Sequence, residues 1–340
     1  MKRLFQVIFL CSFFAPIALQ AQSCVGTASF SVTINPSPTA PVNNGATAQY
    51  CSGGGVYLTA AQSTGNTYQW RLNGTPISGA TSWSYLATSA GNYSVEVTNA
   101  GGCAIVSGNT AVSATTTSCG TLVQARLFLE GPFNTSTSLM NTNLRTANLL
   151  PRLQPFGIAP WNYNGSESVP QISNIPTNAV DWVLVELRNA ANTLVASRAG
   201  FLLNDGTLRD IDGSTGFRFA NTASGSYHVL VRARNHVALI SANAVSLPNA
   251  SALDFSNPSN VMGGTAQVKA LNASLNGLKA GDVNANGVVT VSDFNTLQPQ
   301  LSSINQYLSG DMNMDAQTIT QDFNLYQGNA SSIGVTQVRY

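Results

Sequence analysis

The chain has 340 residues, of which 44% are hydrophobic, so it can build two or three ordinary domains and is not a disordered chain. Only 9% of the residues are charged, far below the roughly 25% usual in soluble domains. Ser, Thr, Asn, Gln and Gly must therefore form most of the wetted surface, as in secreted β-proteins. The formal net charge of +1 excludes the basic footprint of a nucleic-acid-binding protein.

The first residues carry the features of a secretory leader. Lys2 and Arg3 precede an apolar run that is too short for an ordinary spanning helix, and the small residue Ala21 follows. We therefore predict a signal peptide over residues 1–21, cleaved near Ala21, and a secreted or cell-surface protein with no transmembrane segment. Its removal changes the net charge to 13 minus 14, or −1. Lipidation at Cys24 is an alternative, but the aliphatic residue expected three places earlier is absent.

Residues 22–119 are predicted to form an antiparallel β-sandwich. Short alternating runs such as "TYQWRLN" and "NYSVEVTN" are separated by Gly, Asn and Ser. The order Cys51, Trp70, Cys103 resembles the bacterial immunoglobulin-like repeats of cell-surface proteins. The resemblance implies that Trp70 fills the core and that a disulfide between Cys51 and Cys103 closes the sandwich.

The remaining cysteines leave their pairing open. Cys11 lies in the leader, and the other four fall in the first third of the mature chain, where an even count in an exported protein suggests disulfides. The segment from Cys24 looks like a second copy of the segment from Cys103, which indicates the remnant of a preceding domain. On that interpretation Cys24 pairs with Cys119 or has no partner.

Residues 120–278 are predicted to form a second β-sandwich. Runs such as "VDWVLVELRNA" and "SYHVLVRARNHVALISANAV" are strand-like, and no stretch combines a 3.6-residue apolar period with helix caps. The order of "LFLEGPFN", "PWNYNGSESVP" and "GFLLNDGTLRDIDG" resembles an uncharacterised module found upstream of dockerin-like ends in secreted bacterial multidomain proteins. The resemblance implies architecture and context, and no activity.

The stretch "GDVNANGVVTVSDFN" has the spacing of a calcium-binding loop. Ca²⁺ takes six to eight oxygens, and a twelve-residue loop supplies them from alternate side chains, a seventh-position carbonyl and a carboxylate at the twelfth place. Gly287 allows the left-handed turn at the sixth place. The alternative is a polar Asn-Gly hairpin turn. The predicted ligands of this first loop are Asp282, Asn284, Asn286, the Val288 carbonyl, Thr290 (directly or through water) and Asp293.

A second copy, "GDMNMDAQTITQDFN", follows and argues against a chance turn. Its predicted ligands are Asp311, Asn313, Asp315, the Gln317 carbonyl and Asp322. Paired loops of this form, each followed by a short helix, resemble a dockerin type I module, here covering residues 279–330 of a C-terminal segment 279–340. The resemblance implies that Phe294 and Phe323 pack the two helices together, that the Ca²⁺ ions order the loops, and that a cohesin-like domain is the partner. A calcium-ordered cap without a partner is the alternative.

The second loop departs from the pattern at two positions. Ala316 replaces the glycine where positive φ is expected, which costs on the order of 1 kcal/mol. Ile319 stands where a ninth-position oxygen would help. We therefore predict two Ca²⁺ sites, of which the second is weaker.

No catalytic constellation emerges from the sequence. Protease, nucleophile-elbow, P-loop and dinucleotide motifs are absent. His228 and His236 have even spacing on or near one strand, but without a nearby acid they are more typical of surface or core residues. Glu186 is expected to point from the wet face of its sheet. No carboxylate pair supports a glycosidase mechanism, so the sequence favours a non-enzymatic protein.

Two further groups of residues are candidates for binding. Asp205, Asp210 and Asp212 would hold a third Ca²⁺, or they solvate a turn. Trp161 and Tyr163 would stack on a sugar ring, or Trp161 plugs the end of the sandwich.

The whole sequence predicts a mainly β fold with two tandem β-sandwiches and a small helical calcium module. The favoured function is that of an exported calcium-binding modular protein in adhesion or glycan binding, with an extracellular glycan or surface protein as partner. The alternative is a dockerin-bearing component of polysaccharide degradation, either docking to a cohesin or acting as a glycoside hydrolase of unrecognised type.

Overall fold

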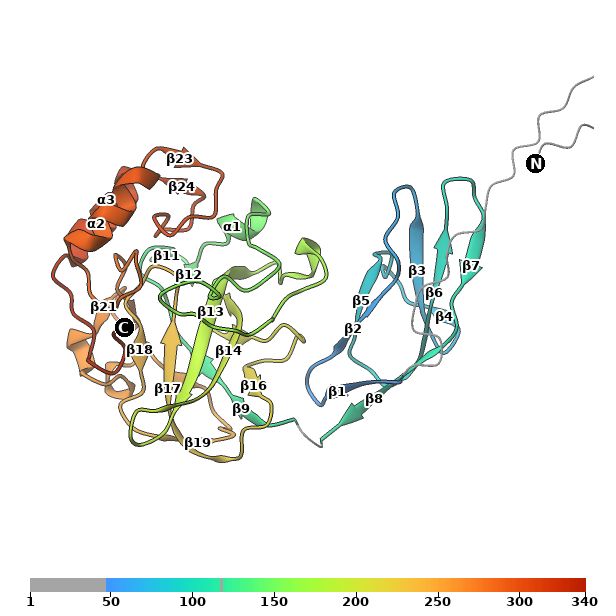
Figure 1. The fold of residues 1–340 in the computed structure, drawn as a ribbon, viewed down its shortest axis with the longest axis horizontal. Helices are drawn as coiled ribbons and strands as arrows, with labels where there is room; N and C mark the ends of the chain where they lie inside the picture. Colours follow the sequence, from blue (N-terminus) through green and yellow to red (C-terminus); the bar gives the residue numbers. More distant parts are fainter. Residues whose placement is uncertain (1–46, 117–118) are drawn as a thin grey trace, which may run out of the picture.

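The computed structural model describes residues 47–116 and 119–340. The predicted leader, its cleavage site near Ala21 and Cys24 lie outside the described residues. Figure 1 shows a small N-terminal β unit beside a larger body that holds the rest of the described chain. The chain is mainly β, as predicted, and its longest helices lie near the C-terminal end. Within the described ranges, no helix is long and apolar enough to span a membrane.

The N-terminal unit has two β layers around one core. Its larger sheet has the order β1-β8-β6-β3-β4, with β7 on β6, and a second sheet pairs β2 with β5. Trp70 is 4% exposed, donates its indole N–H to the Ser82 carbonyl at 2.8 Å and stacks on Tyr85, so it fills the core as predicted. The strands are β1 (Thr47–Cys51), β2 (Val56–Thr59), β3 (Thr67–Leu72), β4 (Thr75–Pro76), β5 (Ser84–Ala87), β6 (Gly91–Thr98), β7 (Ala104–Val106) and β8 (Thr110–Thr115).

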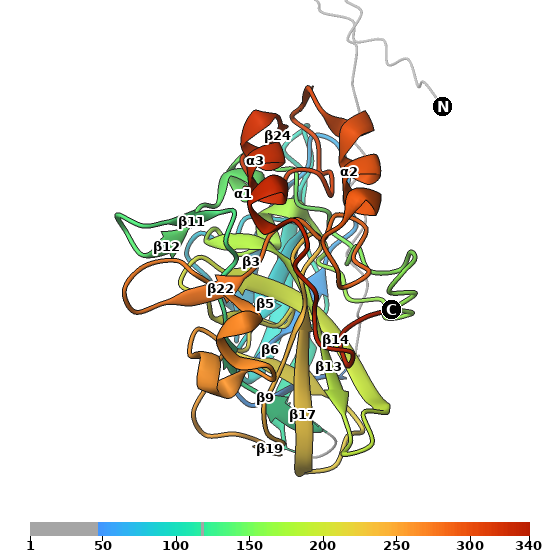
Figure 2. The same ribbon diagram turned by 90° about the vertical axis from the view of Figure 1, so that its left-hand side faces the viewer.

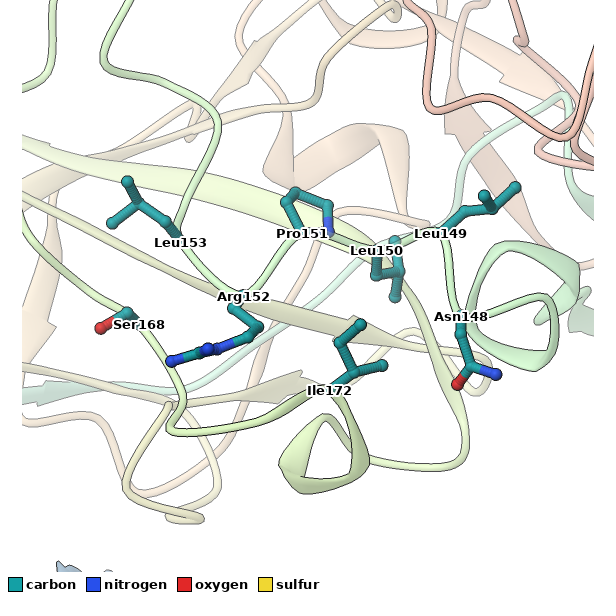
Figure 3. A pocket seen from close by; sticks show the side chains of 8 residues that line it. All are labelled: Asn148, Leu149, Leu150, Pro151, Arg152, Leu153, Ser168 and Ile172. Atoms are coloured by element: carbon teal, nitrogen blue, oxygen red, sulfur yellow. The ribbon is translucent and has the colours of Figure 1, made fainter. Parts of the chain in front are cut away.

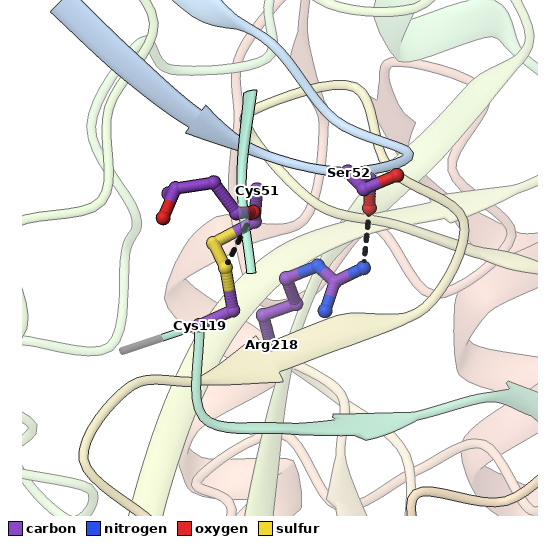
Figure 4. Close-up of a disulfide and its surroundings, with 5 residues drawn as sticks. Cys51, Ser52, Cys119 and Arg218 are labelled. Carbon is purple, nitrogen blue, oxygen red and sulfur yellow. Dashed lines mark hydrogen bonds between the residues drawn. A yellow bond between two sulfur atoms is a disulfide. The ribbon is translucent and has the colours of Figure 1, made fainter. Parts of the chain in front are cut away.

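The predicted disulfide between Cys51 and Cys103 is wrong, because Cys51 is bonded to Cys119 (Figure 4). β1 runs parallel to β8, and Cys51 at the end of β1 lies opposite Thr115 at the end of β8. Cys119 follows shortly after, with 5.7 Å between the two Cα atoms. Cys103 lies in the β6–β7 hairpin at the other end of the sheet, since β6 is antiparallel to β8. The disulfide fastens the chain where it leaves the N-terminal unit.

Hydrogen bonds also join the N-terminal unit to the larger body. Arg218 Nη2 donates to the Ser52 carbonyl at 2.6 Å, beside the disulfide (Figure 4). Ser84 Oγ donates to Asn174 Oδ1 at 2.8 Å. The two units are therefore in direct contact.

The larger body is built on one antiparallel sheet with the order β15-β14-β13-β17-β18 and with β19 on β17. The central strand β13 is buried along almost its whole length, which explains its nearly continuous apolar sequence. The prediction of a β-rich unit is right, but short strand pairs stand in place of a complete second sheet. The strands are β13 (Ala179–Arg188), β14 (Leu194–Leu203), β15 (Leu208–Arg209), β17 (Gly225–Arg232), β18 (Leu239–Ile240) and β19 (Val245–Leu247).

The short elements pack around this central sheet. Phe217 lies so close to Gly200 of β14 that a Cβ on that glycine would come within 2.5 Å of its ring. The pairs are β9 (Thr121–Val123) with β16 (Phe217–Phe219), β10 (Ala125–Arg126) with β20 (Leu253–Asp254), β11 (Phe133–Asn134) with β12 (Leu139–Met140), and β21 (Val268–Ala270) with β22 (Asn276–Leu278). The helical elements are α1 (Asn143–Thr146), η1 (Ile172–Asn174), η2 (Pro258–Asn260) and η3 (Gly264–Ala266).

The C-terminal segment contains the two short helices that the sequence predicts. The rings of Phe294 and Phe323 meet edge-to-face with 6.0 Å between centroids, so these residues pack the helices together as expected. Figure 2 shows both helices at one end of the larger body. The elements are α2 (Val291–Leu297), η4 (Gln298–Gln300), β23 (Ser303–Ile304), β24 (Gln317–Thr318) and α3 (Thr320–Asn329), with β23 paired to β24.

This segment shares a core with the sheet that precedes it. Met314 and Ala316 belong to the same buried apolar cluster as Trp182 of β13. A smaller cluster around Leu297 and Met312 lies within the C-terminal segment itself. Packing therefore continues across the boundary between residues 278 and 279 that the sequence analysis proposed.

Candidate metal-binding loops

The first loop is held in shape by its predicted ligand side chains. Asp282 Oδ2 accepts the Gly287 N–H at 2.9 Å. Asp293 accepts the N–H groups of Asn284 at 3.1 Å and Thr290 at 2.9 Å. The two carboxylates thus draw the start and the end of the loop together, which is the first requirement of a cation site in this segment.

The second loop repeats this pattern at the equivalent positions. Asp311 Oδ2 accepts the Ala316 N–H at 3.0 Å. Asp322 accepts the N–H groups of Asn313 at 3.2 Å and Ile319 at 2.9 Å. Each loop therefore uses the carboxylate at its first place to bind the amide at its sixth, and the carboxylate at its twelfth to bind the amides at its third and ninth.

The last carboxylate of each loop also begins a helix. Asp293 is the third residue of α2, and Asp322 is the third residue of α3. An acidic side chain in the first helical turn satisfies main-chain N–H groups that have no partner within the helix. The aspartate at the end of each loop therefore has two roles, one in the loop and one at the start of the helix.

The loops adopt the left-handed turn that the sequence predicts. Gly287 has a φ of +87°, and Ala316 has a φ of +71° at the equivalent place. A side chain at such a φ is strained by about 1–2 kcal/mol. At the sixth place the second loop therefore carries backbone strain that the first loop avoids with glycine.

One buried oxygen in the first loop has no hydrogen-bond partner. Asp282 is 2% exposed, and its Oδ1 atom receives no hydrogen bond in the described structure. The equivalent oxygen of Asp311 accepts the Asp315 N–H at 3.1 Å. A buried carboxylate oxygen without a donor is costly, and a cation would satisfy it. The residues of the first loop thus fit a metal ion on an observation independent of their spacing.

The electrostatics of both loops point the same way. Burial, together with the charge of Asp293, raises the pKa of Asp282 to about 7. Burial also raises the pKa of Asp311 to about 7, and the positive charge of Arg234 opposes this rise. Burial raises the pKa of Asp293 and of Asp322. Buried carboxylates with raised pKa values lack sufficient positive charge around them.

The donor atoms of both loops are oxygens, which suits a hard divalent cation such as Ca²⁺. In the part of the chain that the structure describes, no three His, Cys, Asp or Glu side chains are close enough to hold a metal by themselves. The carboxylates would therefore need Asn side-chain oxygens and main-chain carbonyls as additional ligands. Asn284, Asn286 and the Val288 carbonyl would supply them in the first loop.

A buried ion pair between Arg234 and Asp181 contacts the segment that leads into the second loop. Arg234 donates to Asp181 Oδ2 through Nε at 3.1 Å and Nη2 at 3.0 Å. Tyr307 donates its hydroxyl to Asp181 Oδ1 at 2.6 Å, and the Arg234 guanidinium lies over its ring. Arg234 also donates to the Leu308 carbonyl. The positive charge near Asp311 thus belongs to Arg234, in the middle of the chain. The sequence predicts a strand there, and this role was not identified from it.

Two asparagines of the larger body hold the main chain of the second loop. Asn235 Nδ2 donates to the Asp311 carbonyl at 2.8 Å, and Asn141 Nδ2 donates to the Asn313 carbonyl at 2.7 Å. Gly131 is so close that a Cβ there would lie 1.9 Å from the Met312 carbonyl oxygen. The larger body therefore fixes the position of the second loop.

His236 supports Asn235 from behind. It is 1% exposed, accepts the Gly131 N–H on Nε2 at 3.4 Å, and has Nδ1 2.8 Å from Asn235 Oδ1. Because Nε2 accepts, Nδ1 carries the proton and donates it to Asn235. Burial, with a smaller contribution from Arg234, lowers the pKa of His236 to about 3. This histidine is a neutral structural residue.

The first loop is held instead by the C-terminal tail, residues 330–340, which follows α3. Gly334 donates its N–H to the Gly287 carbonyl at 2.8 Å, and Val289 donates to the Ser332 carbonyl at 2.8 Å. Val338 is fully buried against β17 and β18, and its carbonyl accepts from Arg232 Nη1 at 2.8 Å. The tail therefore connects the first loop to the central sheet.

The tail also explains why one prediction about the sheet is wrong. Glu186 is 4% exposed and does not point from a wet face. It pairs with Arg188 and with Arg232, whose guanidinium lies 4.1 Å from the ring centre of Tyr340. Glu186 is thus a buried structural carboxylate.

The predicted third calcium site at Asp205, Asp210 and Asp212 is wrong. Both oxygens of Asp210 bind the Arg198 guanidinium at 2.7 Å. Asp205 accepts from Thr207, and Asp212 from the Ser214 N–H, so each side chain serves its own turn. An arginine on both oxygens of the central carboxylate leaves no place for a second cation there.

The predicted sugar-stacking residues are packed against the core. The ring of Trp161 meets Phe156 edge-to-face at 5.2 Å. Tyr163 donates its hydroxyl proton to Glu167 Oε1 at 2.6 Å, and the hydroxyl oxygen lies 3.2 Å from the Ser197 carbonyl oxygen. This packing agrees with the alternative that Trp161 plugs the end of the fold, and glycan stacking stays a prediction.

The two histidines are not brought together on one strand. β17 ends at Arg232, so His236 lies beyond it. His228 lies on β17, with Nδ1 3.1 Å from the Ser241 carbonyl oxygen. The structure gives no catalytic arrangement to this pair.

A surface cleft of about 640 Å³ lies beside η1. Figure 3 shows side chains from two segments around it. No aromatic ring lines the cleft, so it lacks the stacking surface that sugar sites use. Its lining residues are Asn148, Leu149, Leu150, Pro151, Arg152, Leu153, Ser168 and Ile172.

Comparison with known proteins gives no family for this chain. No protein-family model and no curated protein matches it. Among solved structures, an N-terminal interface mutant of a type II cohesin-X-dockerin complex from Acetivibrio cellulolyticus matches at 16% identity and a TM-score of 0.28, covering 45% of this chain and 82% of that chain.

Two other solved structures show similarly limited agreement. The Bacteroides ovatus mixed-linkage glucan utilization locus protein SGBP-B, in complex with a mixed-linkage heptasaccharide, matches at 12% identity with a TM-score of 0.20, over 64% of this chain and 60% of that chain. Sidekick-1 immunoglobulin domains 1–4 match at 16% identity with a TM-score of 0.17, over 59% and 42%. Scores this low carry no argument about function, so the site must be argued from its own geometry.

Proposed function

We propose that this chain is an exported, non-enzymatic modular protein whose C-terminal segment binds two Ca²⁺ ions in a dockerin-like pair of loops. The observation that carries the proposal is the unpaired, buried Oδ1 atom of Asp282 within a loop whose hydrogen bonds recur in a second copy. A bound cation would complete the coordination that this oxygen lacks.

In this proposal the ions stabilise a cap on the central sheet. The second loop contributes Met314 and Ala316 to the main core, and the first loop is tied to the sheet through the tail and Val338. A ligand that binds only the folded form stabilises it by about 2.7 kcal/mol at a 100-fold excess over its dissociation constant. Ca²⁺ would therefore act on the stability of the larger body and not on the C-terminal segment alone.

The two sites would differ in affinity, with the second site weaker. Arg234 is the strongest charge acting on Asp311 and opposes a cation there, whereas Arg232 acts only weakly on Asp282. The Asn313 amide donates to Asp315 Oδ2 at 2.9 Å, so one acidic ligand is already engaged. The strain at Ala316 adds to both effects.

Isothermal titration calorimetry with Ca²⁺ on the chelator-treated full chain tests this proposal. We expect two binding events, the tighter one lost in Asp282→Ala and the weaker one lost in Asp311→Ala. Asp205→Ala is the matched control, because that carboxylate only caps its own turn, and it should keep both events. Absence of Ca²⁺ binding to the unmodified chain, two equal sites, or loss of the tighter event in Asp311→Ala would contradict the proposal.

A second candidate function is docking to a cohesin-like partner through the starts of α2 and α3. Val291 is 68% exposed at the start of α2, and Thr320 and Gln321 are exposed at the equivalent place in α3. Both helix starts face solvent, so both are accessible to a partner. A glycan array combined with cohesin capture separates the roles: bound glycan without cleavage supports adhesion, released oligosaccharide supports an enzyme, and cohesin capture alone supports docking.

A further inference from the structure

Three side chains from distant parts of the chain meet where α3 contacts the larger body. Lys269 Nζ lies 3.1 Å from Glu130 Oε1. Asn329 Nδ2 lies 2.5 Å from Glu130 Oε2. Lys269 Nζ also donates to Asn329 Oδ1 at 3.3 Å. A carboxylate thus bridges an amine and a carboxamide that already touch each other.

The surroundings hold two of these groups in fixed positions. Asn329, the last residue of α3, is 3% exposed, and its Nδ2 also donates to the Ala280 carbonyl at 3.0 Å. Glu130 Oε2 accepts the Ala280 N–H at 3.0 Å. The Lys269 side chain, on β21, remains 39% exposed. The amide and the carboxylate are therefore fixed by the main chain, and the amine keeps access to solvent.

We propose that Lys269 and Asn329 form an intramolecular amide bond, with Glu130 as the catalytic acid–base. Lys269 Nζ transfers a proton to Glu130 Oε1 and attacks the Asn329 carboxamide carbon. The C–N bond to Nδ2 breaks as Glu130 passes the proton to Nδ2, and ammonia leaves and takes up the second proton that the newly bonded Lys269 nitrogen loses. The reaction converts a lysine ammonium and an asparagine carboxamide into a secondary amide and an ammonium ion, so it balances without an oxidant, a reductant or another reactant.

The placement of the atoms matches each step of this reaction. The nucleophile faces one carboxylate oxygen and the leaving group faces the other, so a single carboxyl can relay the proton between them. Because a carbonyl bond is about 1.23 Å long, the carbon under attack is at most about 4.5 Å from Lys269 Nζ. Groups held in such an orientation react as though highly concentrated, which an amide exchange needs.

The other described lysine lacks this arrangement. Lys279 Nζ donates to the Ala266 carbonyl at 2.7 Å and is not paired with a carboxylate. It therefore serves as the matched control residue.

The bond would join β21 of the larger body to the end of α3. Residues 269 and 329 enclose both candidate metal loops, so the loops would lie within one covalently closed segment. This inference does not depend on ion binding, because none of the three groups is a predicted ligand.

Intact-mass spectrometry of the purified, denatured full chain tests the proposal. We expect the protein with the natural sequence and the Lys279→Arg variant each to have a mass lower, by one ammonia molecule, than the mass calculated from its sequence. Glu130→Gln and Lys269→Arg should have the full mass, because the first lacks the acid–base and the second lacks the nucleophilic amine. Circular dichroism checks that both variants are folded.

Peptide mapping decides where any missing mass lies. After proteolysis we expect a branched peptide that joins the Lys269 segment to the Asn329 segment, and a missed cleavage at Lys269. The full calculated mass in the folded protein with the natural sequence would overturn the proposal, and so would a mass deficit without the branched peptide. A branched peptide that persists in Glu130→Gln would overturn the role of Glu130.

Discussion

The two candidate metal loops have nearly the same internal hydrogen bonds but differ in what surrounds them. The second loop is packed into the main core through Met314 and Ala316, and Asn235 and Asn141 bind its main chain. The first loop has an unpaired buried oxygen at Asp282 and is held by the C-terminal tail. Similar loop patterns thus do not imply equal dependence on an ion: the second loop is supported mainly by contacts with the larger body, and the first would be supported by Ca²⁺ as well as by the tail.

Removing the support of the second loop should have the largest effect. Asp181→Asn leaves the buried guanidinium of Arg234 without its counter-charge, which typically costs about 3–5 kcal/mol. Urea denaturation measures this loss. The isosteric control Asp254→Asn removes an ion pair with Arg126 whose side chains are 36–37% exposed, and it should cost less than about 1 kcal/mol. Similar losses in both variants would contradict the account of this support.

Removing Ca²⁺ should have the next largest effect and should act mainly through the first loop. At a Ca²⁺ concentration about 100-fold above the dissociation constant of the first site, chelation should lower the free energy of unfolding by about 2.7 kcal/mol through that site. Urea curves with Ca²⁺ and with chelator give the difference. Asp282→Asn should abolish more of this Ca²⁺-dependent stability than Asp311→Asn. An equal or reversed order would contradict the greater dependence of the first loop on Ca²⁺.

Acidification should weaken the support of the second loop through His236. Its folded pKa of about 3 lies below the usual 6.5, so the unfolded chain binds the proton more readily. The neutral form stabilises the fold fully above pH 6.5, and this stability is lost as the pH falls toward 3. At pH 5 the loss should be roughly 2 kcal/mol relative to pH 8. His236→Gln keeps an acceptor for Gly131, so the difference from the unmodified chain should shrink at low pH; a constant difference would refute this role.

Exchanging glycine and alanine at the sixth positions should give the smallest changes in stability. The change should be larger in the first loop than in the second. Gly287→Ala should cost about 1–2 kcal/mol from backbone strain, and its Cβ would lie 2.8 Å from Arg339 Cγ. Ala316→Gly should be nearly neutral, because the relief of strain is offset by about 0.8 kcal/mol of lost methyl burial and by chain entropy. Thermal unfolding of both variants measures this, and a clear gain in stability for Ala316→Gly would show that strain dominates.

The local features of the candidate site could be predicted from the sequence. The left-handed sixth positions and the helices after each loop depend on residues within about twelve positions, and the ligand roles of the loop residues stay a prediction. The packing of Phe294 against Phe323 was implied by the resemblance to a dockerin module. What lay beyond prediction was the support of the loops, because Arg234 and Asp181 stand far apart in strand-like sequences that gave no sign of pairing.

Long-range pairing also explains the other differences. The choice between Cys103 and Cys119 as the partner of Cys51 depends on the parallel alignment of β1 with β8, which no local pattern reveals. Glu186 alternates like a solvent-facing residue, but the C-terminal tail covers it from far along the chain. Charged residues in strands can be assigned to surface or interior only when the packing partner is known.

Hydrogen exchange of the full chain, with Ca²⁺ and with chelator, tests the central claim most directly. On chelation we expect the amides of Gly287, Val289 and Gly334 to lose much of their protection, because the proposed ion would stabilise the first loop, to which the tail is hydrogen-bonded. The amides of Ala316 and Ile319 should keep most of theirs, since the larger body holds the second loop. Equal or greater loss of protection at Ala316 and Ile319 would contradict the account.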